Sequence, residues 1–390
     1  MKISIDLRSL SSGSISGVEN YTMNIVENLL RQDKKNNYAL FYNAYEARLP
    51  SDYHYVNSKM ALSRIPNKLL NLAFKFGLTS IEKFISDSDT LTPNPSPKGR
   101  GENLLDWFFM PNLNQFNILP NTKLALTVHD LSPVVAPEFY DSKRRLWHWF
   151  LNYKKAFERA DLIFAVSEYT KQDLLKLFQI QENKIKVVHH GVDSEAFSKK
   201  INQEKLRQLR NEKNLPGEFI LFLNTIEPRK NLEGLIKAFE VLDSKSFLVI
   251  AGKSGWKNKS IFKQIQNSKK RNKIIYLDYI SETQKPALIK MASVLVYPSF
   301  YEGFGMQILE AFSLGTPVLA SQVTALPEVS GDAALLVNPY NTKDIAHALQ
   351  HLLTDSEFRD RLAQKGLERA KEFSWQKSAS QILTAFENFK

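Results

Sequence analysis

Residues 297–328 of the chain read YPSFYEGFGMQILEAFSLGTPVLASQVTALPE. The apolar run 293–297 leads into this stretch and predicts a buried strand of a parallel sheet, which Pro298 ends. Two glycines separated by one residue follow, and then a helical pattern from Met306 to Leu314. A glycine and a proline stop that helix, and a second apolar strand starts at Val318. The order strand, glycine loop, helix and strand predicts part of a doubly wound α/β fold.

The glycine loop predicts an anion-binding pocket. Gly303 and Gly305 let the backbone approach a ligand without an intervening Cβ, and the free N–H groups at the start of the following helix favour phosphate or sugar oxygens. Glu302 lies on the loop, and Glu310 lies about one turn into the helix, where its charge can accept from a ribose hydroxyl pair. A carboxylate near a helix N-terminus also stabilises the helix dipole, so a purely structural role for Glu310 is the alternative.

The two glutamates with the GFG loop between them resemble the signature of the retaining glycosyltransferases of family 4, also called group 1, which have the GT-B fold. The resemblance covers nearly the whole chain. It implies two doubly wound Rossmann-like domains that face each other across a cleft. It also implies that Gly303, Phe304, Gly305 and Glu310 bind the donor, and that Glu302 is catalytic.

Two successive series of strands and helices, separated by a polar and lysine-rich segment, predict two domains. We place an acceptor-binding domain at residues 1–198 and a donor-binding domain at residues 199–374. The resemblance implies that a last helix, residues 375–390, crosses back to the first domain. Residues 87–102, DSDTLTPNPSPKGRGE, are too rich in proline, glycine and polar side chains to build a core, and they predict a flexible insertion.

Two strand ends in the first half carry candidate residues. The strand 124–128 ends at His129, which is expected to point into the crevice where α/β sheets bind ligands. Gly17 precedes a helix from Val18 to Arg31. In the family, a histidine at this place contacts the transferred sugar, and the glycine loop lies over the donor phosphates. A structural histidine and an ordinary βα turn are the alternatives.

The segment EPRKN, residues 227–231, follows the first strand of the second half and precedes a helix. Arg229 and Lys230 are therefore placed to neutralise a diphosphate, the arginine by forking two oxygens and the lysine as a point charge. Lys230 aligns with a lysine of the family pattern. Thr225 stands where the family usually has an arginine, so Arg229 would take over that role, and both cations are expected to be catalytic.

We expect neither a P-loop nor a metal site. Gly252-Lys253-Ser254 lacks the earlier glycine of a P-loop, because position 247 is Phe, although Lys253 is placed to face the nucleotide. His189 and His190 begin a segment that resembles the family's HGVD element. As neighbours on an extended chain, the two histidines point to opposite faces, which disfavours a shared metal ion. The only small molecule expected is the nucleoside-diphosphate sugar, as a co-substrate and not a cofactor.

The net charge of +11 predicts an anionic partner. Nucleotide sugars and an anionic membrane both fit, whereas no nucleic-acid-binding motif is visible. Residues 60–85 predict a basic amphipathic helical region, interrupted at Pro66 and Gly77, whose stripe holds Leu69, Leu72, Ala73 and Phe76. This stripe fits either a membrane interface or the core. Since the chain has no cysteine and no apolar run of about 18 residues, we expect a cytoplasmic location, with the inner face of the membrane as the finer alternative.

The resemblance implies that a hexose moves from a nucleoside diphosphate to a glycan or lipid-linked acceptor, with retention and without a metal, in polysaccharide synthesis. The EPRKN form of the cation segment favours mannose from GDP-mannose. Three alternatives stay open: an epimerase or phosphorylase of the same architecture, a nucleotide-sugar-binding protein without turnover, and a basic nucleic-acid binder.

Overall fold

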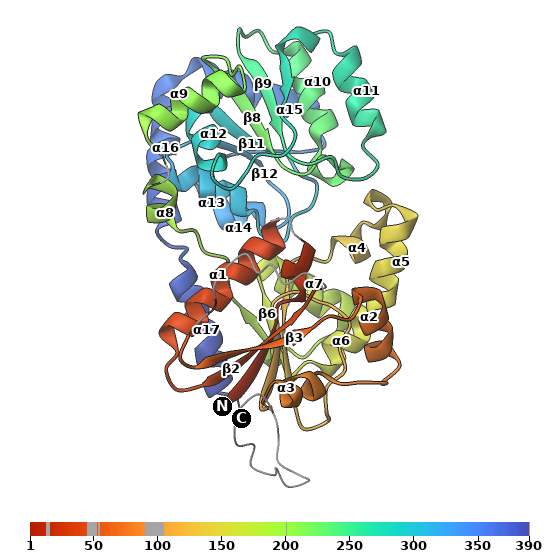
Figure 1. The fold of residues 1–390 in the computed structure, drawn as a ribbon. Helices are drawn as coiled ribbons and strands as arrows, with labels where there is room; N and C mark the ends of the chain where they lie inside the picture. The colour runs from red at the N-terminus through yellow and green to blue at the C-terminus, as the bar shows by residue number, and fades with distance from the viewer. Residues whose placement is uncertain (13–15, 45–52, 54, 90–104, 200, 390) are drawn as a thin grey trace.

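The computed structural model describes residues 1–12, 16–44, 53, 55–89, 105–199 and 201–389. Two parallel sheets, each flanked by helices on both faces, lie one above the other (Figure 1). The predicted fold class, α/β with two doubly wound Rossmann-like domains, is confirmed. No helix in the described part of the chain has both the length and the apolarity needed to cross a membrane.

The first sheet has seven parallel strands in the order β3-β2-β1-β4-β5-β6-β7. Chain order reverses between β1 and β4, and this switch point opens the crevice where an α/β sheet binds ligands. The strands are β1 (Lys2–Asp6), β2 (Asn37–Asn43), β3 (Ser58–Ser63), β4 (Trp107–Met110), β5 (Lys123–Val128), β6 (Leu162–Ala165) and β7 (Ile185–Val187).

Helices cover both faces of this sheet. In the first of them, Tyr21, Ile25 and Leu29 form the buried stripe that their spacing predicts. The elements are η1 (Arg8–Ser12), α1 (Gly17–Gln32), α2 (Asn67–Lys75), α3 (Ile81–Asp89), α4 (Ser132–Val135), η2 (Pro137–Phe139), α5 (Ser142–Leu151), α6 (Tyr153–Arg159), α7 (Glu168–Phe178) and η3 (Glu182–Lys184).

The prediction of a helical region over residues 60–85 is wrong at the start of the region and in the side chains that it buries. Residues 58–63 form β3, which pairs with β2 and buries Ala61 and Ser63. The expected interruption at Gly77 is present: this residue separates α2 from α3 and has a φ of +69°. The stripe also differs: α2 buries Leu70 and Phe74, whereas Leu69, Leu72 and Phe76 are exposed. The predicted insertion 87–102 begins inside α3, and its residues from 90 onward lie outside the described part.

The second sheet has six parallel strands in the order β10-β9-β8-β11-β12-β13. They are β8 (Phe219–Leu223), β9 (Phe247–Ala251), β10 (Ile274–Tyr276), β11 (Val294–Tyr297), β12 (Val318–Ser321) and β13 (Leu335–Val337). The helices around them are α8 (Ser194–Lys199), α9 (Gln203–Glu212), η4 (Pro228–Lys230), α10 (Leu232–Val241), α11 (Lys259–Asn267), η5 (Arg271–Lys273), α12 (Lys285–Met291), α13 (Met306–Ser313), α14 (Leu326–Ser330), α15 (Thr342–Thr354) and α16 (Ser356–Ala370).

The last helix, α17 (Trp375–Glu387), lies beside α1 and packs on the first sheet (Figure 1). The ring of Phe386 lies 5.0 Å from that of Trp107 on β4. The chain therefore passes between the domains twice, near residue 191 and again near residue 374, and the two passages touch. A Cβ on Gly191 would lie 2.1 Å from the backbone nitrogen of Trp375, so only glycine fits there.

A second bridge joins the domains on the opposite side of the molecule, where α4 and α5 approach the loop between β9 and α11 (Figure 1). The indole nitrogen of Trp256 donates to the carbonyl of Phe139 at 2.8 Å, and Lys257 donates to the carbonyl of Glu138 at 2.6 Å. Tyr140 stacks on the Trp256 ring at 5.5 Å. We call this contact the rim bridge.

Candidate active site

A cleft of about 510 Å³ lies between the carboxyl ends of the two sheets. Its position follows from the fold, since parallel strands of both domains end at this face and their loops meet there. All ten predicted site residues line it: Gly17, His129, Arg229, Lys230, Lys253, Glu302, Gly303, Phe304, Gly305 and Glu310.

The centre of the cleft is a buried ion cluster around Glu302. The Lys230 ammonium donates to one carboxylate oxygen of Glu302 at 2.6 Å, and the Arg229 guanidinium donates to the other at 3.1 Å. Both cations belong to η4 and its end, directly after β8, and Glu302 follows β11, the strand paired with β8. The pairing of neighbouring strands therefore brings together groups that are 72 or 73 residues apart.

These charges set each other's protonation states. Burial alone would raise the pKa of Glu302, but the neighbouring Lys230 and Arg229 bring it below its ordinary value. Burial would lower the pKa of Arg229, whereas its carboxylate neighbours, Glu302 first, raise it well above its ordinary value. Glu302 is therefore an anion and Arg229 a cation at neutral pH, although each is less than 10% exposed.

Two acids that the sequence analysis did not select complete the cluster. Glu227 accepts from the Arg229 guanidinium at 2.9 Å, and burial raises the pKa of this carboxyl group. Asp130 lies across the cleft on the first domain, with a carboxylate oxygen 3.9 Å from Arg229. Glu227 belongs to the EPRKN segment and Asp130 directly follows His129. Their position beside predicted site residues could therefore have identified both acids from the sequence.

The glycine loop packs tightly against the first domain. A Cβ on Gly303 would lie 1.7 Å from the carbonyl oxygen of His129, a contact that no side chain permits. The Gly303 carbonyl accepts from the Ser167 hydroxyl of the first domain at 2.8 Å. Gly305 has a φ of +102° and starts α13, so it turns the N–H groups of the helix toward the cleft.

Two buried histidines stand on the first-domain side. His129 Nε2 donates to the carbonyl of Pro111 at 2.8 Å, which leaves Nδ1 as an acceptor, and burial lowers the pKa of this ring. His190, which we had not selected, packs against Phe304 and His129 with ring centroids 4.7 Å and 5.4 Å away. Within the described residues neither ring nitrogen of His190 has a hydrogen-bond partner. Burial takes its pKa well below the ordinary value.

Glu310 lies on α13, in the second domain, and lines the cleft. It has a cationic neighbour that the sequence analysis did not predict. Its carboxylate accepts from Lys285 at 2.7 Å. Burial would lower the pKa of Lys285, but Glu310 and Glu282 raise it. Lys285 starts α12, 25 residues before Glu310, and no local pattern in the sequence pointed to it. A role for Glu310 in binding a ribose stays a prediction.

Gly17 lines the cleft from the first domain and Lys253 from the second. The Lys253 ammonium lies 4.5 Å from the centre of the Tyr279 ring. Gly17 starts α1, and a Cβ there would touch the end of Met306 at 3.6 Å. Among the residues that the structure describes, no group of three or more His, Asp or Glu side chains gathers to hold a metal ion.

A further carboxylate, Glu328, joins the domains beside the cleft. It accepts from the backbone nitrogens of Glu168 and Tyr169, at the start of α7, and from His189 Nε2 at 2.7 Å. The acid belongs to α14 of the second domain, and its three donors belong to the first. The contact spans at least 139 residues of chain, so sequence reasoning could not find it.

Comparisons with known proteins agree with this geometry. Residues 202–369 match the family described as "Glycosyl transferases group 1", and residues 105–196 match "Glycosyltransferase Family 4". O-antigen chain mannosyltransferase B of Escherichia coli is 34% identical over 270 residues, which cover 68% of this chain and 70% of that protein. Serotype-specific mannosyltransferase WbdA of Escherichia coli is 31% identical over 68% of this chain, but this match covers only 33% of WbdA.

Among solved structures, sucrose-phosphate synthase from Thermosynechococcus elongatus has a similar fold. The TM-score is 0.73, with 20% identical residues, and the match covers 99% of this chain and 98% of the other. The likeness in fold and the sequence matches over both halves point to one conclusion. The chain is a glycosyltransferase that belongs to the group 1 family, also called family 4, with the GT-B fold.

Proposed function

We propose that the protein transfers mannose from GDP-mannose to a glycan or lipid-linked acceptor, as a step in surface-polysaccharide synthesis. The carrying observation is the buried cluster of Arg229, Lys230 and Glu302, which faces His129 across the cleft. The choice of mannose is supported by the EPRKN segment and by the names of the relatives, which are O-antigen and serotype-specific mannosyltransferases.

The proposed chemistry depends on stabilising a departing diphosphate. Arg229, Lys230 and the N–H groups at the start of α13 would take up the charge that develops on the leaving oxygen. Each charge-assisted hydrogen bond of this kind contributes roughly 1.5–3 kcal/mol, and only the part made preferentially in the transition state raises the rate.

The remaining groups would hold the sugar. Glu302 would accept from sugar hydroxyls and balance the positive charge that develops at C1, while His129 Nδ1 would accept from a further hydroxyl. The acceptor oxygen would bond to C1 on the face that the diphosphate leaves, so the configuration is retained, and the leaving phosphate would take the acceptor's proton. No metal ion is part of this scheme.

A donor screen tests the proposal. Thermal shifts are measured with GDP-mannose, UDP-glucose, UDP-GlcNAc and the free diphosphates, because a ligand that binds the native state raises the melting temperature. We expect the largest shift with GDP-mannose, release of GDP when acceptor is added, and an α-linked product by NMR. Activity after dialysis against EDTA tests metal independence. A preference for another donor would overturn the choice of mannose, and interconversion of donors without transfer would favour an epimerase.

We also propose that the reaction takes place in the cytoplasm at the inner face of an anionic membrane. A lipid-linked acceptor would be held there, and the charge of +11 would draw the chain toward anionic headgroups.

A further inference from the structure

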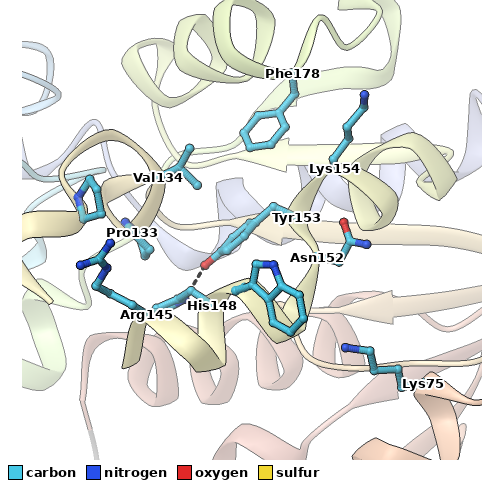
Figure 2. Close-up of a pocket in the computed structure, with 11 residues that line it drawn as sticks. Lys75, Pro133, Val134, Arg145, His148, Asn152, Tyr153, Lys154 and Phe178 are labelled. Carbon is cyan, nitrogen blue, oxygen red and sulfur yellow. Dashed lines mark hydrogen bonds between the residues drawn. The ribbon is translucent and has the colours of Figure 1, made fainter. Parts of the chain in front are cut away.

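A second pocket, of about 440 Å³, lies on the first domain, where α4 and α5 meet the ends of α2, α6 and α7. Figure 2 shows Tyr153 at its centre, with Arg145 on one side and Lys75 and Lys154 on the other. The Tyr153 hydroxyl bonds to His148 Nδ1 at 2.8 Å, which fixes both rings. This pocket shares no lining residue with the catalytic cleft.

The pocket is cationic and has few acids to balance it. Residues 64–78 and 142–155 contain three and five lysines or arginines, and neither segment contains an aspartate or glutamate. Within the described part of the chain, no hydrogen bond or ion pair engages the Arg145 side chain. Among the described residues no acid lines the pocket, although Asp130 acts electrostatically on His148 and Tyr153 from the side of the cleft. Asp141, the residue before α5, pairs with Arg144 at 2.6 Å. Glu158 lies 3.8 Å from Lys154, and both side chains are exposed, so that pair is weak.

Large apolar side chains on the elements that line the pocket face solvent, and two of them, Val134 and Trp149, line the pocket itself. Lys75 joins the two helices that carry most of them, because its ammonium lies 3.8 Å from the Phe150 ring centre and 5.4 Å from that of Trp149. Nine exposed apolar residues belong to α2, α4, α5 and the turn after α2: Leu69, Leu72, Phe76, Leu78, Val134, Val135, Leu146, Trp147 and Trp149. We call them the apolar collar.

The basic pocket and the exposed apolar side chains together favour a lipid of a membrane surface as the ligand. Tryptophan, leucine and lysine side chains on one surface are typical of segments that lie in a bilayer interface, and basic pockets beside such segments bind phosphate headgroups. A neutral glycan would use the aromatic rings but would leave the unpaired Arg145 without a counter-charge. We propose that this pocket binds the headgroup phosphate of an anionic phospholipid, with Arg145 as its main ligand and the apolar collar inserted among the acyl chains.

This inference rests on the membrane location within the proposed function, but not on the transfer reaction. The test is flotation of the full chain with vesicles of phosphatidylcholine, alone or mixed with phosphatidylglycerol. We expect binding to the mixed vesicles only. Arg145→Glu should lower the partition coefficient about tenfold, and Trp149→Gln should lower it through the lost apolar contact. The matched control is Arg207→Glu, which reverses the charge of an exposed arginine on α9 of the second domain and should leave binding unchanged.

Transfer to a water-soluble acceptor is measured on the same variants and should not change, since Arg145 lies outside the catalytic cleft. Equal flotation of the Arg145→Glu and Arg207→Glu variants would overturn the proposal, and so would equal binding to neutral vesicles. The proposal would also be overturned if Arg145→Glu floated as well as the wild type but no longer bound a soluble glycan, because the pocket would then be a glycan site. Absence of transfer in the wild-type chain would refute the proposed function and leave the vesicle result standing.

Discussion

Glu302 illustrates how a single residue can be both structural and chemical. Both of its carboxylate oxygens accept from buried cations, so the side chain keeps Arg229 and Lys230 in place within a site of low dielectric. A buried charge without a partner is costly. The same arrangement holds two cations at the wall of the cleft, and Glu227 and Asp130 place two further carboxylates beside Arg229.

The variant Glu302→Gln keeps the shape of the side chain but removes its charge. We expect turnover to fall about 100-fold, because a charge-assisted contact made at the reacting sugar is lost. Turnover with GDP-mannose and stability to urea are both measured, and Glu357→Gln, at an exposed position of α16, is the control. A near-normal rate in Glu302→Gln would remove this residue from the mechanism.

Buried His190 predicts a dependence of stability on pH. Its pKa in the fold lies well below the ordinary 6.5, so the unfolded chain takes up this proton first as the pH falls. The stability contributed by the neutral ring is therefore present above pH 6.5 and is lost below it.

As the pH is lowered below 6.5, the melting temperature should fall less steeply for His190→Asn than for the wild type. His347→Asn, at an exposed histidine on α15, should follow the wild type. Identical slopes for the wild type and His190→Asn would mean that the ring is not held neutral by the fold.

At the scale of elements, the glycine loop is a tight contact between the domains. Gly303→Ala would place a methyl carbon 1.7 Å from the carbonyl of His129, so the loop and β5 must separate. We expect transfer to drop sharply, while each domain keeps its own core. Gly217→Ala is the matched control, because a Cβ there meets nothing within 4 Å. Activity and hydrogen exchange measure the effect, and equal activity of the two variants would contradict it.

The elements also explain how far the sequence could predict the site. The loop around Gly303, the strand end at His129 and the cations after β8 are local patterns, and the cleft brings all of them together. Lys285 could not be found, because its contact with Glu310 arises from the packing of α12 beside α13. The strand at residues 58–63 was mistaken for helix because its pairing with β2, and not its own periodicity, determines its structure.

For the whole molecule, α17 makes the first domain depend on the C-terminal end of the described chain. Phe386 is buried against Trp107, Phe109 and Phe164 of the first sheet. Phe386→Ala should lower the free energy of unfolding by about 3–5 kcal/mol, measured by urea unfolding. Gln381→Ala, at an exposed position of the same helix, should have little effect. A small loss for Phe386→Ala would mean that α17 is only loosely attached.

The touching passages at Gly191 and Trp375 restrict how the enzyme can admit its substrates. Two chain segments in contact would act as a hinge, so that the domains could rotate about it but could not separate there. In such a rotation the domains would move apart most on the side opposite the hinge. The rim bridge lies there, where Trp256 and Lys257 each donate a hydrogen bond to the first domain. A donor that needs a wider cleft would therefore depend on the rim bridge opening first, at a place remote from the bond that is broken.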